Sequence, residues 1–484
     1  MAASKNALIG RKAVGISFFT SYINTAIQFV SVMVLARILS PSEIGTFSLA
    51  AMLMSMLHVF RDFGVVQYII QERELDRDKL RSVIGVAILL ALAVGAVMLA
   101  LSVPVARFYD NPALRDVMLV MALSFAISPL GSVVLGMLRR EGRLKTIFYI
   151  KTFGSLCQVG AAIGLAMLGY GAISLAWSNF AGILAFGLAA SFFRPKALPW
   201  LPRFRNIRDV LSFGSISSMG SLANMAGTSA PELIIGRVMN AAAVGYFSRA
   251  TGLVQLFQRL IAGALAPLVL PYFSQIRREG KSLDQPYLMA VSQLTAVAWP
   301  FFAVLVLLAY PVTHALYGPQ WDTSVPIARL LCIGGAIAAV GQFASQVMIS
   351  SGNVRSSTLC NLIVQPVRIG AALVASQYGL MAIAGALVVA ECIGLLCVYW
   401  FLRRTIGVTP GGLLRACAKS ALITLCAAAG PLLVWLEGAD TTPHVWIALL
   451  LGGAGALIGW IAGLVLTRHP LANHVLPLLR LRRG

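Results

Sequence analysis

The sequence predicts an all-α polytopic membrane protein with about fourteen transmembrane helices. Hydrophobic residues make up 58% of the 484 residues and charged residues only 11%, whereas soluble domains carry about 25% charged residues. Apolar runs of about 20 residues, the length that crosses a bilayer, recur along the chain. This composition excludes a water-soluble globule.

The predicted spans follow one another with short connections. The longest connections, Arg194–Asp209 and Pro311–Val325, are too short to form a soluble domain, so we expect the function to reside in the membrane. The spans are predicted at residues 13–36, 43–69, 82–106, 117–138, 147–168, 171–193, 210–236, 244–271, 287–310, 326–350, 357–377, 380–402, 417–436 and 444–466.

The positions of the basic residues indicate how the chain is oriented in the membrane. Most of the 38 Lys and Arg residues fall in alternate connections and at their borders, and an excess of Lys and Arg marks the cytoplasmic connections of a membrane protein. Both termini are then predicted to be cytoplasmic. The net charge of +21 therefore indicates membrane orientation, and no nucleic-acid partner is expected.

The cysteine and histidine residues predict neither a disulfide framework nor a metal site. All 7 cysteines lie in or beside apolar spans without a Cys-x-x-Cys pair, as small buried hydrophobic residues do. The 5 histidines are scattered along the chain. We expect no metal and no cofactor.

An internal repeat is the most informative pattern in the chain. Four residues recur after 200 positions, and Gly142 and Gly352 continue the repeat at an offset of 210. An offset of six spans leaves the two copies in the same orientation, which predicts halves related by an axis along the membrane normal. The recurring residues are Arg37, Gly45, Phe47 and Ser48 in the first copy and Arg237, Gly245, Phe247 and Ser248 in the second.

The repeat predicts two parallel six-helix lobes around a central cavity, where substrate sites of such folds lie. We expect an N-lobe at residues 1–205 and a C-lobe at 206–405. Residues 406–484 would add two further helices and a basic cytoplasmic tail.

Charged residues inside the spans are the candidate site residues, because a charge at the bilayer centre persists only when it faces a cavity or a partner. Arg259 lies near the middle of its span, and Gln255 lies one turn away. The pair fits either a polar cavity wall or a buried hydrogen-bond node. Arg249 and Arg329 lie near outer span ends, where long side chains can reach the headgroups.

Three further groups of charges lie within the spans. His58, Arg61 and Asp62 fit either an ion or anion site or a polar helix end against the Glu72 to Lys79 loop. Arg368 and Glu391 lie near the centres of consecutive antiparallel spans, as a buried pair or as separate functional charges. Glu232, beside Pro231, marks either a kinked helix or an interfacial carboxylate.

Arginines outnumber carboxylates within the spans. A cationic interior suits an anionic substrate such as phosphate or pyrophosphate, because guanidinium groups can bind phosphate oxygens in bidentate fashion.

Several short motifs in a fixed order resemble those of Wzx-type polysaccharide flippases, within the multidrug/oligosaccharidyl-lipid/polysaccharide exporter superfamily. The resemblance covers about residues 10 to 405. The motifs include Asp62-Phe63-Gly64, Ile70-Gln71-Glu72-Arg73-Glu74-Leu75, Phe108-Tyr109-Asp110-Asn111-Pro112, Leu233-Ile234-Ile235-Gly236-Arg237 and Gly318-Pro319-Gln320-Trp321.

The resemblance implies a V-shaped transporter of the bacterial inner membrane. Such a protein moves undecaprenyl-diphosphate-linked oligosaccharide repeat units to the periplasmic leaflet by alternating access, driven by an ion gradient. Exopolysaccharide, capsule or O-antigen would be the product. The chain departs from the family at Pro231, where related sequences often carry an acidic residue, and Glu232 is displaced by one position.

These observations define the candidate residues. Arg259, Arg61, Arg368 and Gln255 are candidates for substrate binding. Asp62, Glu391 and Glu232 are candidates for coupling to H⁺ or Na⁺. The expected partners are the polyprenyl-diphosphate-linked oligosaccharide, membrane lipids and other membrane proteins of polysaccharide assembly.

Two other functions remain open at this point. A multidrug or cation antiporter of the same superfamily should favour acidic cavity residues. A membrane-embedded glycan polymerase or ligase would need an acid/base constellation at the outer surface, but the charged and histidine residues of the outer connections are dispersed.

Overall fold

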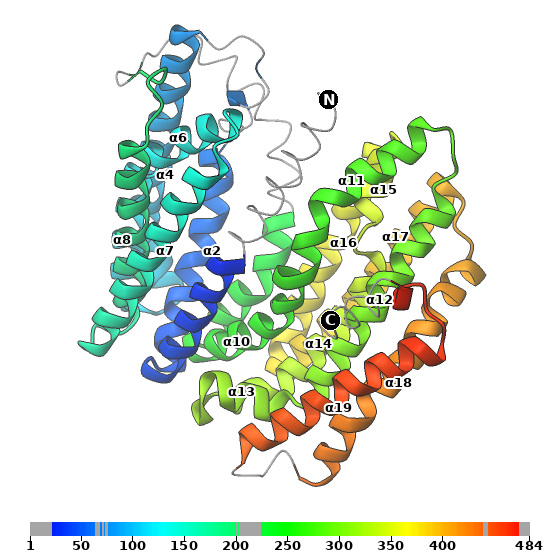
Figure 1. The fold of residues 1–484 in the computed structure, drawn as a ribbon. Coiled ribbons are helices and arrows are strands. Elements are labelled where there is room, and N and C mark those ends of the chain that lie inside the picture. Colours follow the sequence, from blue (N-terminus) through cyan, green and yellow to red (C-terminus); the bar gives the residue numbers. More distant parts are fainter. Residues whose placement is uncertain are drawn as a thin grey trace, which may run out of the picture. The chain divides into compact units, whose positions relative to one another are not determined.

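The computed structural model describes residues 22–62, 68–69, 72, 76–199, 202, 224–438 and 444–473, and its regular secondary structure in these segments is helical (Figure 1). The chain divides into two compact units, Met1–Gly245 and Tyr246–Gly484. Each unit is described by itself.

The first unit is a bundle of long apolar helices. Its core lies between α4, α6, α7 and α8 and is formed by buried residues such as Ile69, Val83, Val134, Leu138 and Ile150. The helices are Tyr22–Ile38, α2 (Pro41–Asp62), α4 (Arg77–Phe108), α5 (Pro112–Ile127), α6 (Pro129–Arg140), α7 (Leu144–Met167) and α8 (Ala172–Phe192), followed by residues 224–238.

Local sequence explains where these helices begin and bend. Asp76 caps α4, because its side chain accepts a hydrogen bond from the Lys79 N–H at 2.7 Å and so satisfies a donor that the helix leaves unpaired. Pro129 follows Ser128 between α5 and α6, which meet at 46°. Proline has no N–H to donate within a helix, so the span predicted at 117–138 is a bent pair.

The second unit is centred on α12, which packs against α14 and α18. Helix α14 also packs against α17, and α18 packs against α19. Large buried side chains, among them Phe257, Phe302 and Tyr287, fill the core. The elements are α10 (Ala241–Phe257), η1 (Gln258–Ala262), α11 (Gly263–Arg278), α12 (Asp284–Leu307), α13 (Ala309–Tyr317), η2 (Pro319–Trp321), α14 (Ser324–Gly341), α15 (Ala344–Ser350), α16 (Val354–Ala375), η3 (Ser376–Tyr378), α17 (Leu380–Ile406), α18 (Pro410–Leu436) and α19 (Val445–Leu466).

The structure confirms a multi-span helical membrane protein. Among the described residues, 10 helices are long and apolar enough to cross a bilayer, or 11 when the bent pair α5–α6 counts as one span. The predicted span 244–271 lies within α10–η1–α11, and the described parts of 13–36 and 210–236 coincide with the helices Tyr22–Ile38 and 224–238. Residues 13–21 and 210–223 of these two spans lie outside the described residues. The total of fourteen spans and the central cavity stay predictions.

The beginnings of the two sequence repeats contact each other. A Cβ atom on Gly45 would lie 1.7 Å from the Ala241 carbonyl oxygen, and one on Gly245 would lie 2.1 Å from that of Pro41. The contact is reciprocal, because each glycine lies against a backbone carbonyl of the other segment. The start of α10 belongs to the first unit, which ends at Gly245, and the lobe boundary at residue 205 stays a prediction.

Candidate functional site

Arg259 lies on a break in the helix that joins α10 to α11. Residues Gln258–Ala262 form the π-helical turn η1, in which the Gly263 N–H donates to the Gln258 carbonyl. Such turns place one extra residue in a helix and are frequent at functional sites. The Arg259 side chain is exposed, and its Nη2 donates to Gln255 Oε1 at 3.1 Å.

Gln258, the first residue of this turn, pairs with Gln342. Gln258 Nε2 donates to Gln342 Oε1 at 3.0 Å, and Gln342 Nε2 donates back to Gln258 Oε1 at 3.2 Å. This amide pair ties η1 to the residue that follows α14. We call Gln255, Gln258, Arg259 and Gln342 the polar turn.

The side chains of the polar turn are largely exposed. Gln255, Gln258 and Arg259 are all exposed, although they lie within the predicted span 244–271. A guanidinium exposed to lipid tails at this depth would be costly. The exposure speaks against a buried hydrogen-bond node, and a polar wall reached by water stays a prediction.

Arg368 and Glu391 form an ion pair. Arg368 Nη1 on α16 lies 3.0 Å from Glu391 Oε1 on α17, and the two side chains are 28% and 24% exposed. The two charges that could act separately thus neutralise each other in this structure.

Helix α14 lies between the ion pair and the polar turn. A Cβ on Gly334 would lie 3.7 Å from Glu391 Cγ, and one on the next residue, Gly335, would lie 3.1 Å from Val254 of α10. The structure therefore brings Arg259 together with Gln255, and Arg368 together with Glu391, but places the two pairs on different sides of one helix.

The candidates of the first unit are more scattered. Arg61 is half-buried in the last turn of α2, and the His58 ring lies 4.9 Å from that of Phe125. Asp62 ends α2, and its side chain lies outside the described part of the chain. Glu232 is buried within the helix at residues 224–238, with 6% of its surface exposed.

Two polar residues of the first helix serve helix packing. Ser155 Oγ donates to Asn24 Oδ1 at 2.9 Å, and Gln28 Nε2 donates to Gln158 Oε1 at 3.3 Å. Both bonds join the helix Tyr22–Ile38 to α7.

Aromatic and backbone contacts hold the arginines near the outer span ends. Arg249 lies against the rings of Tyr317 and Trp321, with its Cζ 5.7 and 5.6 Å from their centroids. Arg329 Nε donates to the Val306 carbonyl at 3.2 Å.

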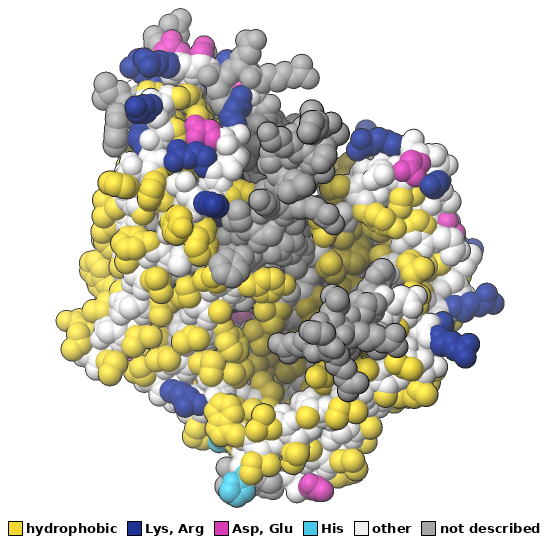
Figure 2. Space-filling model, in the orientation of Figure 1, with side chains coloured by type: hydrophobic (Ala, Val, Ile, Leu, Met, Phe, Trp, Pro, Cys, Tyr) yellow, Lys and Arg dark blue, Asp and Glu magenta, His cyan; other side chains and the backbone are white. Residues whose placement is uncertain are grey.

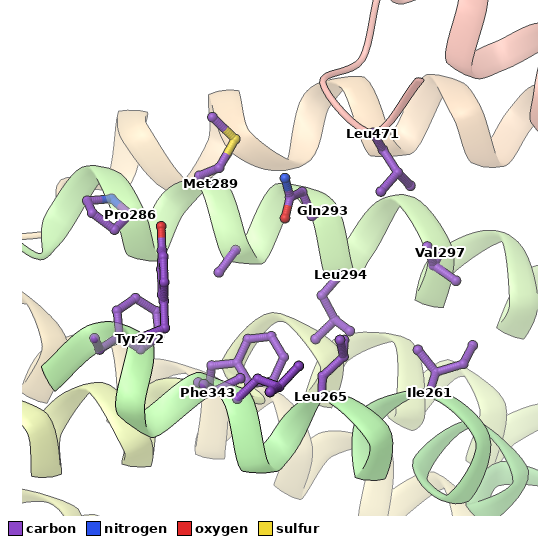
Figure 3. A pocket seen from close by; sticks show the side chains of 14 residues that line it. Ile261, Leu265, Tyr272, Pro286, Met289, Gln293, Leu294, Val297, Phe343 and Leu471 are labelled. Atoms are coloured by element: carbon purple, nitrogen blue, oxygen red, sulfur yellow. The ribbon is translucent and has the colours of Figure 1, made fainter. Parts of the chain in front are cut away.

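An apolar groove runs between α11 and α12 (Figure 3). Its cavity has a volume of about 420 Å³ and is lined by side chains such as Leu265, Tyr272, Val297 and Phe343. Ile261, two residues after Arg259, lies at one end, and Leu471 contributes from the segment after α19. The groove therefore begins beside the polar turn.

Sequence reasoning missed Gln258, Gln342 and the groove. Gln258 adjoins Arg259 and could have been noted as a third polar residue of the same turn. Gln342 follows α14 and meets the turn from 84 residues away, and no local pattern reports such a contact. Among the described residues, no group of His, Cys, Asp and Glu could hold a metal ion.

The chain is similar to proteins of polysaccharide assembly. The family described as polysaccharide biosynthesis protein matches residues 34–326. The succinoglycan biosynthesis transport protein ExoT of Rhizobium meliloti is 26% identical over 70% of this chain and 68% of its own length. The lipopolysaccharide biosynthesis protein WzxC of Escherichia coli is 21% identical over 72% and 71%.

A solved structure shares the fold. The lipid II flippase MurJ in an inward closed conformation matches 94% of this chain and 99% of its own with a TM-score of 0.77, at 15% identity. At this identity the likeness shows the fold alone, and it confirms a polytopic helical membrane protein.

Proposed function

Because the chain belongs to the polysaccharide biosynthesis protein family, we propose that it is a flippase that moves polyprenyl-diphosphate-linked oligosaccharides across the membrane by alternating access. The bacterial inner membrane is the proposed location, and undecaprenyl diphosphate is the proposed carrier. The chain acts as a transporter of surface polysaccharide assembly, not as an enzyme, in keeping with the transport role that the name of ExoT states.

The exposed guanidinium of Arg259 is the observation that carries the proposal. Among the described residues it makes one hydrogen bond, to Gln255, and so retains N–H groups that can bind a diphosphate in bidentate fashion. The three glutamines of the polar turn add amide donors and acceptors for sugar hydroxyls. The cationic character disfavours the alternative substrate class, the cationic drugs of a multidrug antiporter.

The apolar groove supplies the second half of an amphiphilic site. A polyprenyl diphosphate has a charged head joined to a long hydrocarbon, and the groove begins two residues from Arg259. With the diphosphate at the polar turn, the first isoprene units would lie between α11 and α12. We propose the carrier's hydrocarbon chain as the occupant of this groove.

Ion coupling is proposed at Glu391, with Asp62 and Glu232 as the other candidate acids. A proton or sodium ion that neutralised Glu391 would weaken its attraction to Arg368. Arg368 would then be available to an anion. Arg61 is retained as the candidate anion contact of the first unit.

The test is polysaccharide display in a strain that lacks its own flippase and expresses this chain. We expect Arg259→Ala to reduce surface polysaccharide about tenfold or more and Arg259→Lys to retain part of it, because Lys keeps the charge but not the bidentate geometry. Arg115→Ala, which removes an exposed arginine of α5, is the matched control. Full display by Arg259→Ala at normal expression would refute the assignment, and efflux of cationic dyes without display would support the antiporter.

A further inference from the structure

A cationic pocket lies where α4 begins and α8 ends, in the first unit. Its volume is about 490 Å³, and its charged lining residues are Arg77, Arg81, Arg194 and Lys196. Ser191, Pro195 and residues 197–199 complete the lining. No carboxylate is among the described residues that line this pocket, although acidic side chains lie nearby on the same end of the unit.

Three of these nearby acids have partners outside the pocket. Glu72 pairs with Lys79 at 2.7 Å, Asp76 caps α4 through the Lys79 N–H, and Glu141 lies 3.7 Å from Arg143. The partners of Glu72 and Glu141 are thus Lys79 and Arg143, neither of which lines the pocket.

The arginines of the pocket differ from ordinary surface arginines. Nε of Arg81 is buried and has no hydrogen-bond partner among the described residues. Arg77 lies one turn earlier on the same face of α4, and like charges at this spacing repel. An anion between the two guanidinium groups would satisfy the buried donor and relieve the repulsion.

Arg194 gives the pocket a fixed wall. Its Nε donates to the Leu198 carbonyl at 3.3 Å and its Nη2 to the Pro199 carbonyl, which closes the loop after α8. Burial lowers the pKa of Arg194 below its ordinary value, because a buried cation lacks the stabilisation that water gives it. A bound anion would restore this stabilisation.

The length of α4 places the pocket at headgroup depth. The helix has 32 residues, whereas about 20 residues cross the hydrocarbon core. Its charged first turn, residues 77–81, precedes the predicted span 82–106, which places that turn beyond the core. The pocket lies at the end of the unit where dark blue Lys and Arg side chains gather in Figure 2. The predicted topology makes this end cytoplasmic.

We propose that this pocket binds the phosphate group of a membrane lipid at the cytoplasmic surface. Membrane topology explains an excess of positive charge in cytoplasmic connections. It does not explain why these charges line a pocket, or why a buried N–H donor there has no partner among the described residues. Basic pockets of this kind at membrane surfaces bind anionic headgroups. The lipid is either the polyprenyl diphosphate before translocation or an acidic phospholipid, and both present the same phosphate oxygens.

Binding to the purified full-length chain tests the proposal. Undecaprenyl diphosphate and phosphatidylglycerol are titrated separately and the bound lipid is counted by native mass spectrometry, while inorganic pyrophosphate is titrated by calorimetry. We expect Arg77→Gln/Arg81→Gln to weaken binding of lipid about tenfold or more. Arg77→Lys/Arg81→Lys should retain most of it. The matched control is Arg143→Gln/Lys145→Gln, which removes two charges at the same end outside the pocket.

The outcomes distinguish the two candidate lipids. Tighter binding of undecaprenyl diphosphate than of phosphatidylglycerol, lost in the pocket variant, supports a loading site for the transported lipid. The reverse order, lost in the same variant, supports anchoring of an acidic phospholipid. Equal binding by wild type and the pocket variant overturns the proposal, as does pyrophosphate binding as tight as that of either lipid. No transport is measured, so this result is independent of the Arg259 test.

Discussion

Arg368 and Glu391 face each other across the α16–α17 hairpin, with 3.0 Å between Nη1 and Oε1. The same hairpin places Cys360 Sγ 3.7 Å from Cys397 Sγ and Val364 against Gly394. The ion pair is thus one rung of a regular antiparallel contact. Removal of either side chain would therefore leave the other charge without its partner in this contact.

The first prediction concerns the stability of this pair. Removal of one partner from a fully buried pair costs about 3–5 kcal/mol, and because about a quarter of each side chain is exposed (28% and 24%), we expect about 1–3 kcal/mol for Arg368→Gln or Glu391→Gln. The double variant should be more stable than either single variant, because no charge is left unpaired. Apparent melting temperatures of the purified variants measure this, and additive losses would show that the two charges do not interact.

The second prediction concerns the helix crossing at Gly45. Gly45→Ala would place a methyl group 1.7 Å from the Ala241 carbonyl, so the backbones must separate, at a cost of about 1–3 kcal/mol. Gly160→Ala on α7 is the control, because a Cβ there meets nothing within 4 Å and alanine favours a helix. The melting temperature should fall for the first variant and hold or rise for the second. Equal values for both would show that the crossing does not constrain the fold.

The spans could be predicted because the bilayer sets their length and composition. The intramembrane charges could likewise be found from the sequence, since their cost marks them. The pairing of these charges could not be predicted, because it depends on the register of the two helices in the hairpin. The α16–α17 turn uses Gly379 at φ 98°, and a different turn would shift Glu391 away from Arg368.

The polar turn shows a second limit of prediction from the sequence. Helical periodicity predicts which residues share a face, but it assumes a constant 3.6 residues per turn. The π-helical turn at residues 258–262 departs from this spacing and so shifts the face. The contact between Gln258 and Gln342 joins segments 84 residues apart. Only the packing of α14 beside α10 creates it.

The third prediction concerns the apolar groove. Ala290→Trp should fill part of the 420 Å³ cavity and so reduce polysaccharide display, while the melting temperature stays near that of the wild type. Leu450→Trp is the control, because Leu450 on α19 is 72% exposed and does not line the groove. Undiminished display by Ala290→Trp, with both proteins at equal levels in the membrane, would show that the hydrocarbon chain does not use this groove.

The fourth prediction concerns pH and the segment after α19. His469 is buried; its Nδ1 accepts from the Leu471 N–H at 3.2 Å, and its Nε2 lies 2.9 Å from Ser292 Oγ on α12. Because Nδ1 accepts, the neutral ring with a proton on Nε2 fits this site. The segment that carries Leu471 to the groove is therefore held by an uncharged histidine.

Burial, with the nearby charge of Lys419, lowers the pKa of His469 below its ordinary value of 6.5. The unfolded chain therefore takes up a proton at a higher pH than the folded chain does, and the free energy of unfolding decreases as pH falls below about 6.5. His469→Gln cannot take up this proton, so its melting temperature should fall less between about pH 7.5 and about pH 5.5 than that of the wild type. The control is His444→Gln, which removes an exposed histidine before α19 and should keep the wild-type pH dependence. The same pH dependence in His469→Gln as in the wild type would show that this histidine does not link protonation to the docking of the segment.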